Sequence, residues 1–358
     1  MTAFSNLQKR LATVLAVLLA LLLGVSGYFT IQVLAQERPE VRLATVHASL
    51  DRESCESCHA PIAAEWRESF HFRSVTGPFW ERIRAKGYDR VFQALRVACM
   101  NCHAPANVLD LADGAKPVER TEDVARGVDC VSCHVSERGI LGPGRLLNAP
   151  HEVIRDERFM NPALATATIC ASCHDEATDH AKTVTAWRET EFARNGVTCL
   201  HCHMPEVQAP SVSGGPSRLR RSHRFLGDKS EEMLRAALNA SILLTDGRQA
   251  VVRIVNDRVG HSFPASGMNF LFVRVTVHDQ SGRLVREVER EFGTTERLPG
   301  FLDFWPFLQV TKIPSGASRD IAVELPSGRG RVAAEFRYRD WATIVDRDRV
   351  IGTITTPF

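Results

Sequence analysis

The sequence predicts a mixed fold in three parts, and three observations support that prediction. An uncharged stretch spans residues 11–35, five copies of Cys-x-x-Cys-His fall between residues 55 and 203, and short segments of alternating apolar residues fill the C-terminal part of the 358-residue chain. We therefore expect an N-terminal transmembrane helix, a loop-rich and mainly α domain at 55–239, and a small β-sandwich at 240–358.

The N-terminal stretch, residues 11–35, is long enough to cross a bilayer as a helix. Lys9 and Arg10 precede it, so the positive-inside rule places residues 1–10 in the cytoplasm and the bulk of the chain outside. Because the stretch is long for a signal peptide, we expect a retained single-pass anchor in the inner membrane, followed by a polar linker at 36–54. The alternative is a cleaved signal peptide and a secreted periplasmic protein.

All ten cysteines belong to the five motifs, and none is left over. In a motif of this kind, two thiols form thioethers to a haem and the adjacent histidine binds the iron from one side. Zinc sites would combine cysteine pairs two by two, which an odd number of pairs does not allow. A disulfide framework is excluded because the thioether bonds to haem use up every thiol. We therefore predict five covalently bound haem c groups in the 55–239 domain. The attaching cysteines are Cys55, Cys58, Cys99, Cys102, Cys130, Cys133, Cys170, Cys173, Cys199 and Cys202, and the proximal histidines are His59, His103, His134, His174 and His203.

The formal charge of +2 describes the polypeptide alone. Each ferric haem with two ionised propionates adds about −1, so the oxidised holoprotein would carry about −3. Charge therefore gives no reason to expect a nucleic acid partner. We expect redox proteins as partners, including a membrane complex, together with membrane contact through the N-terminal helix.

Within the haem domain we expect modest helices, such as Glu119–Arg126 and Lys229–Asn239, joined by loops. There is one weak internal repeat, since Trp66-Arg67-Glu68-Ser69 follows the first motif and Trp187-Arg188-Glu189-Thr190 follows the fourth. We expect both tryptophans to pack in the core or against porphyrin rather than to take part in catalysis.

The C-terminal region reads as short strands with alternating or β-branched residues, separated by Asp-Gly, Ser-Gly and Pro-containing turns. Several strands at this spacing predict a small β-sandwich without cysteine. The expected strands are 250–255, 270–278, 283–291, 318–325 and 331–339.

Each haem iron also needs a ligand on its second face, or an open position there, and this choice separates an electron relay from an enzyme. Eight of the thirteen histidines remain after the proximal ones. They are enough to cap five irons, so nothing in the sequence demands an open haem. The predicted distal ligands are His71, His151, His180, His223 and His261, with His47 in reserve.

Position in the chain supports these choices. His71 and His180 follow the first and fourth motifs closely, and His261 occupies a Gly-His-Ser-Phe-Pro turn from which a loop of the β domain could reach a haem. His151 follows a Gly/Pro-rich loop, and His223 lies in a basic stretch. No spare histidine lies between His71 and His151, so the second and third haems must be capped from a distance.

Four stretches resemble multihaem cytochromes of the cytochrome c-554 group, within the superfamily of hydroxylamine oxidoreductase and pentahaem nitrite reductase. They are His59-x6-Trp66-x2-Ser69-x-His71, Gly127-Val128-Asp129-Cys130, Gly196-Val197-Thr198-Cys199 with Cys202-His203-Met204-Pro205, and Gly260-His261-Ser262-Phe263-Pro264. The resemblance covers about residues 50–345. It implies closely packed haems, mostly with two histidine ligands, the five proximal roles above, and distal roles for His71, His151, His180 and His223.

Two departures weaken the catalytic analogies within that superfamily, and a third bears on the ligand role of His261. No motif ends in lysine, as the catalytic haem motif of the nitrite reductases does, and no tyrosine stands near a motif for the crosslink of hydroxylamine oxidoreductase. The loop after His261 is one residue longer than in relatives.

We therefore expect a membrane-anchored, periplasmic pentahaem cytochrome that relays electrons between a membrane or periplasmic donor and an acceptor. The sequence favours an electron-transfer protein over a stand-alone enzyme without deciding between them. Two alternatives stay open, a reductase or oxidase of a small nitrogen or sulfur compound at one open haem, and a cytochrome subunit of a larger membrane complex.

Overall fold

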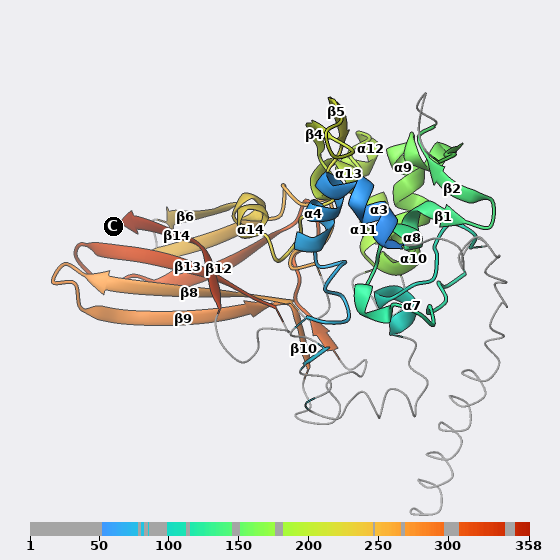
Figure 1. The fold of residues 1–358 in the computed structure, drawn as a ribbon. Helices are drawn as coiled ribbons and strands as arrows, with labels where there is room; N and C mark the ends of the chain where they lie inside the picture. The colour runs from blue at the N-terminus through green and yellow to red at the C-terminus, as the bar shows by residue number, and fades with distance from the viewer. Residues whose placement is uncertain are drawn as a thin grey trace, which may run out of the picture. The chain divides into compact units, whose positions relative to one another are not determined.

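In the computed structural model, short helices with small sheets form the haem-motif region and long strands form the C-terminal region (Figure 1). The chain divides into two units, residues 1–43 with 90–97 and residues 44–89 with 98–358. All the residues that the structure describes belong to the second unit. The structure describes residues 52–77, 80–81, 85, 99–111, 115–144, 151–175, 182–245, 248–265, 269–296, 308–340 and 348–358.

The helices of the haem-motif region are short because loops and motif turns interrupt them. The longest described helix there, α4, has nine residues; it buries Ala63 and Trp66, three positions apart on one face. The helices are α3 (Arg52–Cys58), α4 (Ala60–Glu68), α7 (Met100–His103), η1 (Val124–Arg126), α8 (Cys130–His134), η2 (Glu157–Phe159), α9 (Pro162–Ala165), η3 (Thr166–Cys170), α10 (Ala171–His174), α11 (Thr183–Arg188), α12 (Glu191–Arg194), α13 (Cys199–His203) and α14 (Glu231–Ala237).

Strands also occur between and after the motifs. A three-stranded sheet has the order β1-β2-β3, and β4 and β5 form an antiparallel hairpin after the fifth motif. Their bounds are β1 (Val135–Ser136), β2 (Gly139–Gly142), β3 (Ile154–Arg155), β4 (Glu206–Pro210) and β5 (Ser217–Arg221).

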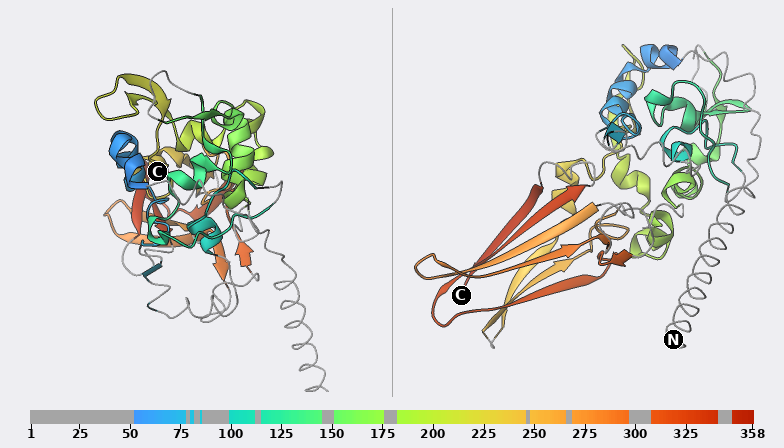
Figure 2. Two further views of the ribbon diagram at one scale, coloured as in Figure 1. Left: turned by 45° about the vertical axis from the view of Figure 1, so that its right-hand side comes forward. Right: turned by 90° about the horizontal axis from the view of Figure 1, so that it is seen from below.

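The C-terminal strands form two main antiparallel sheets, ordered β12-β7-β6 and β14-β13-β8-β9, and β10 and β11 form a separate pair (Figure 2). Alternate residues of β7, β8 and β13 point inward, so the main sheets share one apolar core that includes Val252, Val275 and Phe336. The strands are β6 (Ala240–Thr245), β7 (Gln249–Val255), β8 (Asn269–Asp279), β9 (Leu284–Phe292), β10 (Thr294–Glu296), β11 (Leu308–Val310), β12 (Ser318–Glu324), β13 (Gly330–Asp340) and β14 (Arg349–Pro357).

Two parts of the predicted fold are corrected. The mainly α expectation is wrong, because 27% of the described residues are helix and 34% are strand, with strands in the haem-motif region itself. Where a helix was expected over Glu119–Arg126, only the three-residue η1 forms. Asp123 has a left-handed backbone before η1 and Gly127 has a positive φ after it, so the chain turns at both ends.

The predicted transmembrane helix is also corrected. No helix in the part of the chain that the structure describes is long and apolar enough to cross a membrane, which contradicts the single-pass anchor and the inner-membrane location based on it. The stretch predicted to form that helix, 11–35, lies outside the described residues, as does most of the 36–54 linker.

Candidate haem-binding sites

Each of the five motifs coincides with a helix or a helix end. The third and fifth motifs lie entirely in α8 and α13, the second and fourth end with α7 and α10, and the first runs from α3 to His59, which caps α4. Helical positions i, i+3 and i+4 share one face. The local fold therefore directs both thiols and the imidazole of each motif to the same side.

The two motif helices α8 and α13, each of which begins at the cysteine of a Gly-Val-x-Cys sequence, are capped in the same way. Asp129 caps α8 by accepting a hydrogen bond from the Ser132 backbone N–H at 3.2 Å, and Thr198 caps α13. The Nδ1 atom of His201 accepts the Thr198 backbone N–H at 3.0 Å, which completes a capping box. The exposed ring of His201 thus has a structural task at its own helix.

Four proximal histidines each face one of the predicted distal histidines. Two imidazoles that bind one metal from opposite sides, each through Nε2 at about 2.0–2.1 Å, have ring centroids roughly 6.3 Å apart. The four observed separations match this value, so each pair has room for one iron between its rings. The centroid separations are 6.1 Å for His59 and His151, 6.2 Å for His134 and His223, 6.3 Å for His174 and His71, and 6.3 Å for His203 and His261.

Backbone carbonyls orient the rings by accepting a hydrogen bond from Nδ1–H. This fixes the tautomer and leaves the Nε2 lone pair for a metal. No sequence pattern reveals these acceptors, because every residue has a backbone carbonyl. The acceptors are Ser211 for His59 at 2.9 Å, Ser74 for His103 at 3.0 Å, Leu141 for His134 at 3.1 Å, Leu226 for His203, Arg221 for His223 at 3.1 Å and Ser262 for His261 at 3.0 Å.

Burial keeps two of the facing histidines neutral. Burial and the nearby rings of His174, His203 and His103 lower the pKa of His71 to about 3. Burial, and next the neighbouring His134, lower the pKa of His223 to about 4. Neutral imidazole is the form that binds metals, so the environment favours ligation over surface protonation.

The thiols are arranged for haem attachment rather than for a metal cluster. None of the ten cysteines forms a disulfide, and no group of three or more His, Cys, Asp or Glu side chains among the described residues could hold a metal ion. Burial, followed by Asp129 and Cys130, raises the pKa of Cys133 to about 12. Burial therefore keeps this sulfur as a neutral thiol.

The weak tryptophan repeat corresponds to a repeated hydrogen bond. The indole Nε1–H of Trp66 donates to the carbonyl of Val128, and that of Trp187 donates to the carbonyl of Val197, both at 2.8 Å. Both acceptors occupy the same place in Gly-Val-x-Cys, before a motif helix. Each tryptophan therefore ties the segment after one motif to the beginning of another, the first to the third and the fourth to the fifth.

Cysteines of the same two pairs of motifs lie close enough to affect each other's pKa. Burial, Asp129 and then Cys55 of the first motif raise the pKa of Cys130 in the third motif to about 11. A hydrogen bond between the thiols of Cys170 and Cys199 lowers the pKa of Cys199 and joins the fourth motif to the fifth.

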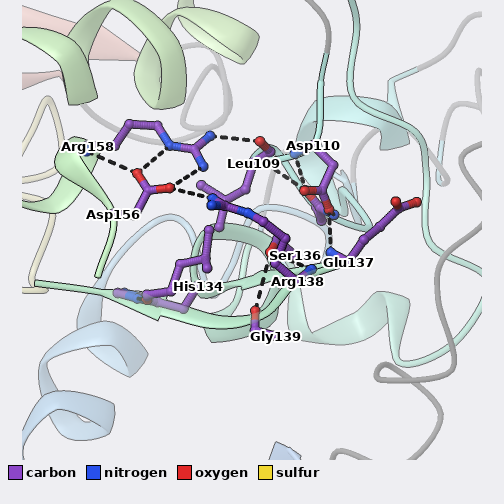
Figure 3. A network of polar contacts seen from close by, with 11 residues as sticks. Leu109, Asp110, His134, Ser136, Glu137, Arg138, Gly139, Asp156 and Arg158 are labelled. Carbon is purple, nitrogen blue, oxygen red and sulfur yellow. Dashed lines mark hydrogen bonds and ion pairs between the residues drawn. The ribbon is translucent and has the colours of Figure 1, made fainter. Parts of the chain in front are cut away.

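A polar network lies beside the third motif (Figure 3). Arg158 holds Asp156 through its Nε at 2.8 Å and reaches the carbonyl of Leu109 through Nη1 at 2.7 Å. The next residue, Phe159, stacks on His134 with ring centroids 4.8 Å apart and an interplanar angle of 20°. The network thus fixes the segment that covers one side of this proximal imidazole.

Phe225 lies between two of the facing histidines. Its ring meets that of His71 at 4.4 Å and that of His223 at 5.8 Å, centroid to centroid, both edge-on. Its φ of 44° places it in the left-handed region, which is uncommon for a bulky residue. This segment therefore brings residues of the third and fourth sites into contact.

The remaining predicted site residues are placed less completely. His103 of the second motif meets Trp80 edge-on at 5.2 Å. The predicted distal ligand His180 and the reserve His47 lie outside the described residues. Their ligand roles stay predictions.

Comparison with known proteins supports a haem-binding role. Residues 54–135 match the family described as cytochrome c554 and c-prime. No curated protein matches the chain. Among solved structures, a penta-heme cytochrome c552 from Thermochromatium tepidum is 18% identical, covers 86% of this chain and 99% of its own, and superposes with a TM-score of 0.63. At that identity the likeness shows the fold.

Other structural matches cover only part of the chain. A superoxide reductase from Nanoarchaeum equitans covers 35% of this chain at 12% identity and 92% of its own, with a TM-score of 0.20. So low a score carries no argument about function. The five motifs and the matched family segment show that this chain is a multihaem c-type cytochrome, and its residues 54–135 are similar to the family described as cytochrome c554 and c-prime.

Proposed function

We propose that the protein is a periplasmic pentahaem cytochrome that relays electrons between redox partner proteins. A bound haem c supplies an iron that accepts and releases one electron. The observation that supports the proposal most strongly is the set of four histidine pairs, because a chain that fills both axial positions leaves no coordination site for a substrate there.

Each proposed site combines one motif with a histidine from elsewhere in the chain. His59 and His151 hold the first haem, and His134 and His223 hold the third. The fourth is held by His174 with His71, and the fifth by His203 with His261. The second has His103 as its proximal ligand, and His180 is the one predicted distal ligand that none of the other four sites uses.

Contacts between the sites suit a relay. The tryptophan hydrogen bonds join the first site to the third and the fourth to the fifth. Phe225 joins these two pairs through the distal histidines of the third and fourth sites. Ligation by two histidines also suits a low-potential chain, since methionine in place of one histidine raises the potential.

Donor and acceptor would be redox proteins, one of them in a membrane complex. Intact mass and the pyridine haemochrome spectrum test the haem count, for which the proposal expects five haems per chain. Carbon monoxide tests the ligation. Slow or absent binding to the reduced protein supports a relay, whereas rapid binding at one haem would support an enzyme with one open haem.

A further inference from the structure

Glu65, on α4 beside the first motif, is bound to the segment that carries His223. Its carboxylate receives two hydrogen bonds from Arg220, Nη1 to Oε2 at 2.9 Å and Nη2 to Oε1 at 2.8 Å. The same Oε2 accepts the backbone N–H of His223 at 2.7 Å. The Glu65 and Arg220 side chains are only 20% and 10% exposed, so water screens the pair weakly.

Arg220 also supports the imidazole end of His223. The carbonyl of Arg221 accepts the Nδ1–H of His223 at 3.1 Å and a hydrogen bond from Arg220 Nη1 at 3.1 Å. Glu65 therefore holds the backbone of His223 and the Arg221 carbonyl holds its ring, and both acceptors also bind the Arg220 guanidinium. This guanidinium is in turn fixed by Glu65 and by the carbonyl of Pro210, at 3.1 Å from Nε.

We propose that Glu65 is a positioning residue for the third haem. From α4, the helix that follows the first motif, it would hold His223 in place as the distal ligand of the iron bound to His134. The inference rests on the proposed ligation by His223. Groups that hydrogen-bond to a metal ligand orient that ligand and tune the properties of the metal. Their loss commonly lowers metal affinity or activity about 10–100-fold. A carboxylate close to the distal ligand also favours the ferric state and lowers the reduction potential of that iron.

The chain offers a matched control one turn further along α4. Glu68 pairs with Arg224 at 3.2 Å, and Arg224 directly follows His223. Here the side chains are 64% and 54% exposed, and surface pairs of this kind contribute little. Removing Glu68 deletes the same charge from the same helix without touching the support of His223.

The test compares holoprotein variants by electron paramagnetic resonance and spectropotentiometry. In Glu65→Ala we expect one haem equivalent to become partly high-spin. In Glu65→Gln, whose amide oxygen still accepts the His223 N–H, we expect all haems to keep their spin state and one midpoint potential to rise. Glu65→Asp should restore part of the original potential, and Glu68→Gln should match the wild type.

Glu65 variants that match Glu68→Gln in both spectra and potentials would overturn the inference. If Glu65→Ala does not accumulate as holoprotein, the potential of Glu65→Gln decides alone. His223→Ala separates this failure from failure of the proposed ligation. A new high-spin haem in His223→Ala leaves the ligation standing, whereas an unchanged low-spin spectrum rejects the ligation itself.

Discussion

The imidazole rings of His71 and His174 lie 6.3 Å apart, centroid to centroid, although His71 follows the first motif and His174 closes the fourth. The first proximal histidine, His59, faces His151 instead. The predicted distal histidine nearest to His59 in sequence is therefore not the one that faces it. The segment after one motif supplies the proposed distal ligand for the haem of another motif.

The variants His71→Ala and His151→Ala test this interleaving. Each should convert one haem equivalent to a high-spin, carbon monoxide-binding form, because each removes one axial ligand. Since the two residues serve different irons, the double variant should show two high-spin equivalents by electron paramagnetic resonance. A single equivalent in the double variant would mean that both act at one haem. His201→Ala, which changes only a helix cap, serves as the control.

Gly127→Ala should damage the site of the fourth haem. Gly127 has a φ of +63°, and a Cβ there would overlap the carbonyl oxygen of His71 and the hydroxyl of Ser74. The left-handed conformation alone would cost the alanine about 1–2 kcal/mol, and we expect the free energy of unfolding to fall by well above that amount. The spectrum of the haem that His71 binds should also be perturbed. Gly196→Ala is the control, because its φ is +72° and nothing lies within 4 Å. Equal losses in denaturant titrations of the two variants would refute the steric argument.

Trp66→Phe should destabilise the holoprotein by about 1–3 kcal/mol, because the Val128 carbonyl loses its indole donor. Trp66 is 4% exposed and Trp187 is half-buried, so Trp187→Phe should cost less. Guanidinium unfolding followed by Soret circular dichroism measures both. A smaller loss in Trp66→Phe than in Trp187→Phe would contradict the expectation that losing the donor costs more at the buried site.

The Asp156 network predicts a loss of stability in acid. Hydrogen bonds from Arg158 hold the pKa of Asp156 well below its usual range. A carboxylate with a lowered folded-state pKa stabilises the protein above the unfolded pKa of about 3.9 and loses that effect as the pH falls toward the folded value. Asp156→Asn should therefore lower the urea midpoint at pH 7 and flatten its fall between about pH 5 and pH 3. A parallel shift at every pH would contradict this, and Glu157→Gln in the same turn is the control.

Local patterns in the sequence predict the parts of the site that are local. Cys130, Cys133 and His134 are adjacent in sequence, so the motif determines their geometry on a single helix. The pairing of His134 with His223 depends on how the chain returns after the fifth motif, which no spacing rule encodes. Position in the chain named His71 as a ligand without naming the haem it serves, and the structure places His174 of the fourth motif opposite it.

Strand prediction shows the same limit. The alternation in β8 and β13 reflects burial on one face and is legible in the sequence. β6 went unpredicted because it is an edge strand with Leu243 and Leu244 both exposed, so its pattern does not alternate. The short strands between the motifs escaped notice because two to five residues give too little pattern to recognise.

The spin state of the oxidised holoprotein tests the central claim most directly, because it reports how many irons have two protein ligands. Electron paramagnetic resonance with spin quantitation should show at least four low-spin ferric haems per chain, one for each histidine pair. Two or more high-spin haems in the intact protein would contradict the account, since at least one of the four pairs would then not hold an iron.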